Sequence, residues 1–281
     1  MEKQTFGNVF FAEFSRIIRK PSMLIAYALF AFAAIVGADL VHSLMVSAVD
    51  MAQDQMDPAT AAESMALLTP NPNVLYTTLE GCAGIMVWVA ALYCIARVCI
   101  EHNDTLVRAE LIVVPNRTRL FFARLLAWVC ASGLLLLAAQ LLCLGYTLAV
   151  HGSYITDFGL NGAYLAGSLL LPWVCGLCVV ALCFGLATLV RSAALSMIAY
   201  FCLASVLSTV LSGVAGMLPQ PLCTVVQVFS DSMLGNSLGI TMGVTAQLEG
   251  PYYLMAWGGM IVWTVGLIVL AFVRFKKSYS N

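Results

Sequence analysis

Charge is what this 281-residue sequence has least of. Only 10% of its residues are charged, whereas a soluble globular domain has about 25%. Hydrophobic residues make up 62% of the chain, and the mean hydropathy is +0.94. Several apolar runs reach the roughly 20 residues that a bilayer crossing needs. These features exclude an ordinary soluble fold and predict an all-α membrane protein, whose helices satisfy their own backbone hydrogen bonds in lipid.

Some sequence signatures of catalysis are also missing. The chain has no GxxxxGK[ST] phosphate-binding loop and no HExxH zinc motif. Its three histidines, His42, His102 and His151, are far apart in the sequence. We therefore expect that this chain is not an enzyme, binds no metal or cofactor of its own and has no nucleic-acid partner.

The ten cysteines do not suggest a disulfide framework. Nine of them lie in or at the ends of apolar runs, where cysteine acts as a small hydrophobe, and only Cys223 falls outside. Cys175 and Cys178 form a CxxC motif, but no histidine or carboxylate lies nearby in the sequence. Helix packing is the favoured interpretation of this pair, and metal or redox chemistry is the alternative.

Six apolar runs are expected to cross the membrane, within a single domain that covers residues 1–281: 22–44, 74–99, 120–150, 163–190, 193–218 and 251–273. The third exceeds the bilayer thickness and should protrude or tilt. Pro172 should kink the fourth. Between the last two runs, residues 221–233 are apolar but too short to cross, which indicates a helix on or partly in the membrane.

The N-terminal residues 1–20 are expected to include an amphipathic helix at the membrane surface. Phe6, Phe10, Phe14 and Ile17 recur at helical spacing on one face. Glu13 falls at the edge of that face, where it can pair with Arg16 three residues later. The pair either is solvated at the surface or has a structural role inside the bundle. No cleavage site of a signal peptide follows.

Basic residues are distributed unevenly along the chain. All 13 Lys and Arg lie before the first predicted span, around residues 97–124, at Arg191, or after the last span. With six spans these places fall on one side, and the other three loops carry only acidic charges. Since cytoplasmic loops are enriched in Lys and Arg, we expect a multi-pass protein of a cell membrane, such as a bacterial cytoplasmic membrane, with both termini in the cytoplasm.

The same rule places the charged segment 100–119, between spans two and three, in the cytoplasm. Asn103, Asp104 and Thr105 suit the start of a helix, and Pro115 should stop it. A helix of about ten residues is too short to cross the bilayer. We interpret it as a docking element for a partner protein.

This layout resembles the type 2 ABC transporter permeases, which are the membrane subunits of ABC exporters. The family's segment at this place is roughly E-x-E-x-G-T-L followed by Pro, Arg and a basic residue that leads into span three. The matching residues here are Glu101, Thr105, Leu106, Pro115, Arg117, Arg119 and Arg124. The sequence departs from it at Asn103 and Asp104, which replace the second Glu and the Gly.

The resemblance implies a separate ATPase subunit, which would bind ATP and Mg²⁺ and dock on residues 101–119. It also implies a second permease, either another copy of this chain or a similar one, next to membrane lipid. The residues expected to couple the two subunits are Glu101, Asp104, Thr105, Leu106, Arg108, Glu110, Pro115, Arg117 and Arg119. The alternative is that these charges only anchor the span ends at the lipid headgroups.

Two further sets of residues are candidates for a transport path. Glu80 lies near the outer end of span two, close to Asp39 and His42 at the end of span one; it either lines a vestibule or is an interfacial acid in water. The small polar side chains of span five share one helical face, and close helix packing is their favoured role: Ser205, Ser208, Thr209 and Ser212.

The expected function is therefore outward transport of a substrate by an ATP-driven exporter. Lipids, peptides and drug-like molecules all remain open as substrates. An ATP-independent secondary transporter or channel is one alternative, although the sequence contains no internal repeat. A membrane anchor or sensor subunit that transports nothing is the other.

Overall fold

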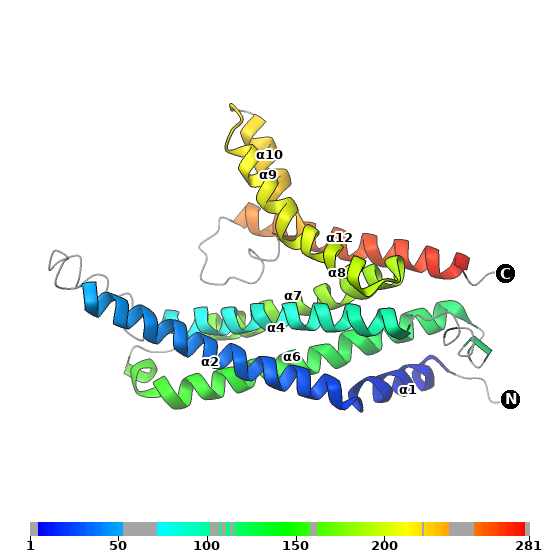
Figure 1. Cartoon of the computed structure of the whole chain (residues 1–281), viewed down its shortest axis with the longest axis horizontal. Helices are drawn as coiled ribbons and strands as arrows, with labels where there is room; N and C mark the ends of the chain where they lie inside the picture. The colour runs from blue at the N-terminus through cyan, green and yellow to red at the C-terminus, as the bar shows by residue number, and fades with distance from the viewer. Residues whose placement is uncertain are drawn as a thin grey trace.

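The computed structural model describes residues 5–52, 72–101, 107, 111–112, 114, 116–157, 162–220, 222–235 and 250–278. The regular elements of these residues are all helices (Figure 1). In chain order they are α1 (Phe6–Ile18), α2 (Pro21–Ala52), α4 (Pro72–Glu101), α6 (Arg117–Asp157), α7 (Gly162–Val190), α8 (Ala193–Phe201), the π-helix η2 (Cys202–Val206), α9 (Leu207–Ala215), α10 (Leu222–Asp231) and α12 (Gly250–Ser278).

Five of these helices, or helix runs, are long and apolar enough to cross a membrane: Thr78–Glu101, Arg117–Val150, Gly162–Val190, Ala193–Ala215 and Tyr253–Ser278. A sixth is added if α1 and the first part of α2, which meet at an angle of 58°, count as one bent span. The all-helical class is confirmed, and the helices are consistent with a multi-pass membrane protein.

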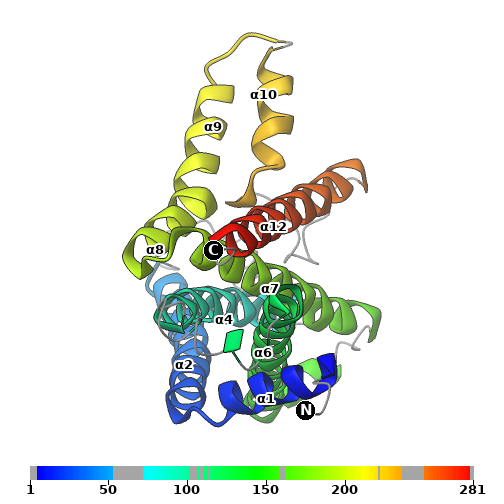
Figure 2. The same ribbon diagram turned by 90° about the vertical axis from the view of Figure 1, so that its right-hand side faces the viewer.

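The first helix is held by a cap and by one buried face. The Thr5 hydroxyl oxygen accepts a hydrogen bond from the Asn8 amide at 3.4 Å, which satisfies one of the free donors at the start of α1. The buried residues of α1 are Val9, Glu13 and Ile17, which recur at intervals of four. This face packs on α6 (Figure 2). Of the residues on the predicted apolar face, Ile17 is buried against the protein and Phe6 is 42% exposed.

Helices α2, α4, α6 and α7 form the main bundle, in which α7 packs against α4 and α6 on one side and against α12 on the other (Figures 1 and 2). Of the most apolar stretch of α7, 61% is buried inside the protein, whereas the share for α12 is 28%. Aromatic rings fill the contact near the start of α6: Phe121 lies 5.6 Å from both Phe184 and Phe275 between ring centroids. The core therefore depends on apolar packing between helices that are distant in sequence.

Two close contacts secure the flanks of α7. The helix runs unbroken through Pro172, and the neighbouring Trp173 indole donates to the Gly133 carbonyl of α6 at 2.8 Å. On the other flank, a Cβ placed on Gly185 would lie 3.1 Å from the Leu267 carbonyl of α12. The absence of a side chain at Gly185 thus permits the backbones of α7 and α12 to approach.

The fifth predicted span is one helical run, Ala193–Ala215, whose middle turn is π-helical. It consists of α8, the π-helical turn η2 and α9, and it begins after Arg191, whose backbone is left-handed with φ of 60°. The apolar segment after it forms α10, which pairs with α9 in a hairpin that projects from the bundle (Figures 1 and 2). A π-turn commonly marks a bend or a functional region in a helix.

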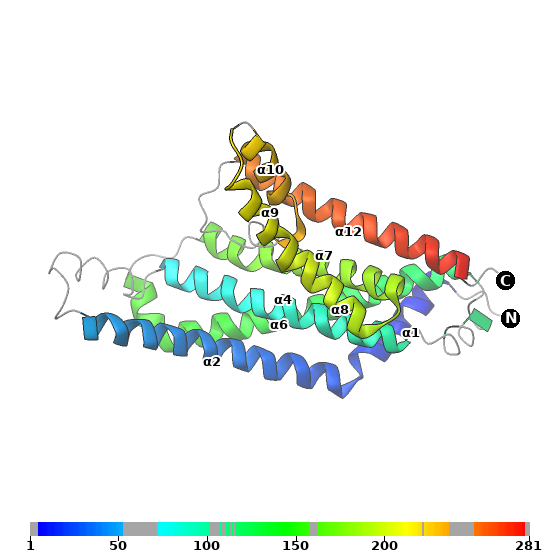
Figure 3. The ribbon, with the colours of Figure 1, turned by 45° about the horizontal axis from the view of Figure 1, so that its top comes forward.

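One end of the bundle gathers the described basic residues. The end of α1, the C-terminus of α4, the N-terminus of α6, the turn between α7 and α8, and the last turn of α12 all lie at this end (Figures 1 and 3). The start of α7 lies at the opposite end. We call the first of these the cationic end.

Replacing Gly185 with Val should loosen the contact between α7 and α12, because the added carbons meet backbone that cannot rotate away. We expect a loss of about 1–3 kcal/mol in the free energy of unfolding, measured in detergent micelles. Gly145→Val is the matched control, since a Cβ there meets nothing within 4 Å. Equal stability of the two variants would contradict the close approach.

Candidate functional site

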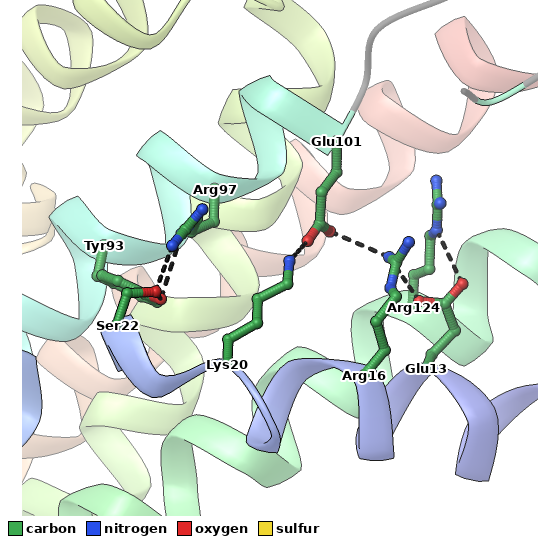
Figure 4. Close-up of polar contacts among 8 residues, drawn as sticks. All are labelled: Glu13, Arg16, Lys20, Ser22, Tyr93, Arg97, Glu101 and Arg124. Atoms are coloured by element: carbon green, nitrogen blue, oxygen red, sulfur yellow. Dashed lines mark hydrogen bonds and ion pairs between the residues drawn. The ribbon is translucent and has the colours of Figure 1, made fainter. Parts of the chain in front are cut away.

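Five charged side chains of alternating sign form a chain of ion pairs at the cationic end (Figure 4). The Lys20 ammonium contacts one oxygen of Glu101, and Arg16 Nη2 lies 3.2 Å from the other. The same Arg16 nitrogen lies 2.7 Å from Glu13 Oε2, and Arg124 Nε lies 3.3 Å from Glu13 Oε1. Each carboxylate is thus held between two cations.

This network is mostly shielded from solvent. Glu13 and Glu101 are each 8% exposed, and Arg124 is 2% exposed. A charge removed from water is costly unless it is paired and hydrogen-bonded. Arg16 and Lys20 remain more open, with side chains 36% and 27% exposed. The buried residues Glu13, Glu101 and Arg124 therefore constrain how the helices pack more than the partly exposed Arg16 and Lys20 do.

The network joins three helices. Glu13, Arg16 and Lys20 belong to α1 and the residues that follow it, and their spacing of three and four places them on neighbouring parts of one helix side. Glu101 is the last residue of α4, and Arg124 lies two turns into α6. Both ends of the segment between α4 and α6 are therefore tied to α1.

Helix dipoles explain part of this charge arrangement. Arg16 lies in the last turn of α1, where the partial negative charge of the helix end favours a cation. Glu101 lies at the C-terminus of α4, where the same partial charge disfavours an anion. The two cations of α1 and its C-terminal end offset that disadvantage.

A second polar cluster lies beside the network (Figure 4). Arg97 of α4 donates to the Ser22 hydroxyl of α2 and, through Nε, to the Tyr93 hydroxyl at 3.2 Å. The two hydroxyls lie 3.0 Å apart. The guanidinium carbon of Arg97 also lies 5.6 Å from the centre of the Tyr93 ring, within cation–π range. This cluster joins the start of α2 to α4.

Four described residues show how the segment between α4 and α6 lies on the protein. Val107 and Val114 are 0% and 8% exposed, and Leu111 is partly buried against the core. Ile112 is 84% exposed. Val107 and Leu111 are helical and four residues apart, which places them on one face, and Ile112 points away from that face. The segment therefore has an inner apolar face and an outer apolar residue.

The start of α6 fixes the far end of this segment. The Asn116 side-chain oxygen accepts the Arg119 amide at 3.1 Å, an N-cap arrangement. Arg117 and Arg119 lie in the first turn of α6, partly exposed and outside the network of Figure 4. The other predicted coupling residues lie outside the described residues: Asp104, Thr105, Leu106, Arg108, Glu110 and Pro115.

The two candidate path regions lie apart from the network. Glu80 is partly exposed in α4, while the side chains of Asp39 and His42 lie outside the described set. In the fifth run, the hydroxyls of Ser212 and Ser230 lie 2.9 Å apart, and Ser230 donates to the Ser208 carbonyl at 3.4 Å. Since Ser230 belongs to α10, this contact holds the hairpin together.

The remaining hydroxyls of the same stripe bond locally. Ser208 and Thr209 both donate to the Ser205 carbonyl, at 3.1 and 2.8 Å. Thr209 is exposed, whereas Ser208 is buried. These contacts agree with the packing interpretation of the stripe, and a transport path there is untested. Within the described residues, no group of three or more His, Cys, Asp or Glu is placed to hold a metal ion.

The sequence does not indicate the partners of Lys20 and Arg124, because their carboxylates lie 81 and 111 residues away. Arg124 belongs to the predicted motif, whereas Lys20 and Ile112 are not among the predicted site residues. The exposure of a single apolar residue such as Ile112 depends on how the segment packs. By contrast, the Glu13–Arg16 pair expected from the spacing is present.

Replacing Arg124 with Ala should remove one of the two cations that pair with Glu13, which leaves Arg16, and should create a cavity beside α6. We expect a loss of about 3 kcal/mol in the free energy of unfolding, toward the low end for a broken buried pair. Lys276→Ala, which removes an exposed cation at the same end, should change it by less than about 0.5 kcal/mol. Equilibrium unfolding in mixed micelles measures both, and equal losses would contradict the buried pair.

No protein-family model matches the sequence, and no curated protein matches it either.

Proposed function

We propose that this chain is the membrane-spanning permease subunit of an ATP-driven exporter of the type 2 ABC transporter class. The observation that supports this most is the ion-pair network, which ties both ends of the segment between α4 and α6 to α1. A short segment with fixed ends can transmit force to the helices that flank it. The motif residues Glu101, Arg117 and Arg119 lie at these ends.

The segment would receive the motion of a separate ATPase subunit. Its inner face, with Val107 and Val114, is seated on the bundle, so a push would move the ends of α4 and α6 instead of bending a loop. The exposed Ile112 would fill an apolar groove on the ATPase, surrounded by the charged residues of 101–119. ATP and Mg²⁺ would be bound by that partner, since this sequence has no phosphate-binding loop.

Transport would use two permeases, either two copies of this chain or one copy with a similar one. The contact between the two permeases would use helices that are little buried within one chain. Of the apolar stretch of Ala193–Ala215, only 22% is buried. The substrate, whether lipid, peptide or drug-like, would move outward between the two.

The proposal requires the cationic end to face the cytoplasm, where the ATPase and its nucleotide are. Single cysteines placed in a cysteine-free background test this. Asn116→Cys, at the cationic end, should react with an impermeant thiol reagent only after cells are permeabilised. Gly162→Cys, exposed at the opposite end, should react on intact cells. The reverse pattern would overturn the proposal.

Docking of the ATPase is tested at Ile112. Replacing Ile112 with Asp puts a charge where an apolar contact is expected, so the purified chain should retain about tenfold less of the ATPase encoded beside it. Asn116→Asp is the matched control, because it adds the same charge four residues away and can still cap α6.

Co-purification in mild detergent, with both subunits quantified, measures this loss. A chain with Ile112→Asp that retains as much ATPase as the Asn116→Asp control would exclude docking through this residue. Absence of any ATPase from the unsubstituted chain would favour a transporter without an ATPase or an anchor subunit.

A further inference from the structure

Two cations at the bend between α1 and α2 have no carboxylate partner within the described part of the chain. Arg97 is partly buried, and the groups that receive its hydrogen bonds, the Ser22 and Tyr93 hydroxyls, are neutral. Arg19 caps the end of α1, is exposed and forms no ion pair with any described residue. Nearby, Glu101 is already shared by Arg16 and Lys20. Among the described residues, the bend therefore carries more positive charge than carboxylates pair with.

The backbone adds to this positive potential. Helix α2 begins at Pro21, directly after Lys20, and it has no acidic residue in its first turn. The N-terminus of a helix carries a partial positive charge. Of the first three residues of α2, Pro21 has no amide proton and the Met23 amide donates to the Lys20 carbonyl, so the helix contributes mainly through its dipole. Ser22, to which Arg97 donates, lies in this first turn, so Arg97 and the start of α2 favour an anion at the same place (Figure 4).

The surroundings of the bend are those of a lipid headgroup. Directly beyond the cations, α2 exposes Leu24 and Ile25, at 46% and 57%, and α1 exposes Phe11 at 65%. Apolar side chains that continue from a cationic cluster at the end of an apolar helix match a phospholipid, whose phosphate lies just above its acyl chains. A free phosphate ion has no apolar surface, so these exposed apolar side chains would not contribute to its binding.

We propose that the bend between α1 and α2 binds the phosphate of an anionic phospholipid, through Arg19 and Arg97. The phosphate lies over the start of α2, and its acyl chains lie along the exposed side chains of α2. The bound lipid neutralises the excess charge and fixes the angle between α1 and α2. This site is independent of the proposed transport function.

The test measures lipid retained by the purified full-length chain in detergent, using native mass spectrometry with added phosphatidylglycerol or phosphatidylcholine. The unsubstituted chain should retain phosphatidylglycerol in preference, and phosphatidylglycerol should raise its unfolding temperature. Arg19→Gln with Arg97→Gln should lower phosphatidylglycerol retention about tenfold, since two charge-assisted contacts are lost. Arg19→Lys with Arg97→Lys should retain most of it.

The matched control removes two other cations from the same end of the bundle. Lys276→Gln with Lys277→Gln changes the net charge equally, in the exposed last turn of α12, and should bind like the unsubstituted chain. If the double Gln variant at the bend fails to fold, Arg19→Gln alone, at an exposed position, should still lower retention.

Three results would overturn the proposal. The first is equal retention of phosphatidylglycerol by a folded Arg19→Gln, Arg97→Gln variant and the unsubstituted chain. The second is equal retention of phosphatidylcholine, which would show no preference for an anion. The third is an equal rise in unfolding temperature with inorganic phosphate alone, which would assign the site to a soluble anion.

Discussion

Two carboxylates, each held between two cations, constrain how the cationic end of this protein is built. Glu13 and Glu101 are almost fully buried, and a buried anion is stable only beside its counter-charges. Because Arg16 and Lys20 come from α1 and its end while Arg124 comes from α6, the three helices have to meet there. The orientation of α1 follows from this meeting, and so do the fixed ends of the segment between α4 and α6.

Apolar packing is tight around α7 and loose along the run from α8 to α9. The contacts around α7 are tight, with Gly185 admitting the backbone of α12 and Trp173 bonded to α6. The run from α8 to α9 is mostly exposed and is interrupted by the π-turn η2. A permease needs both properties, since a firm bundle passes on a push and a loosely packed side can change its contacts with a second permease. In the proposed function, an ATPase pushes on the cationic end, the tightly packed bundle around α7 transmits the motion, and the exposed run from α8 to α9 changes its contacts.

The two polar clusters at this end differ in how their charges are satisfied. In the ion-pair network, carboxylates and guanidinium groups from the protein face one another. In the cluster of Arg97, Tyr93 and Ser22, the described groups that meet the cation are neutral hydroxyls and a ring. Each carboxylate of the network has cations beside it, whereas no described carboxylate pairs with Arg97. A membrane with anionic lipid supplies a counter-charge where the apolar helices emerge.

The sequence by itself determined the helical class, the apolar runs, the break at Pro21 and the local pair of Glu13 with Arg16, because these depend on neighbours within about four residues. It also marked Glu101, Arg117 and Arg119, while six other predicted coupling residues lie outside the described structure. Only the tertiary structure decided that Glu101 meets Lys20, that Glu13 meets Arg124, and that the fifth run contains a π-turn and pairs with α10. Hydrophobic periodicity dictates which face of a helix is buried, but it does not dictate which other helix covers that face. Long-range partners are therefore set by packing of the whole chain.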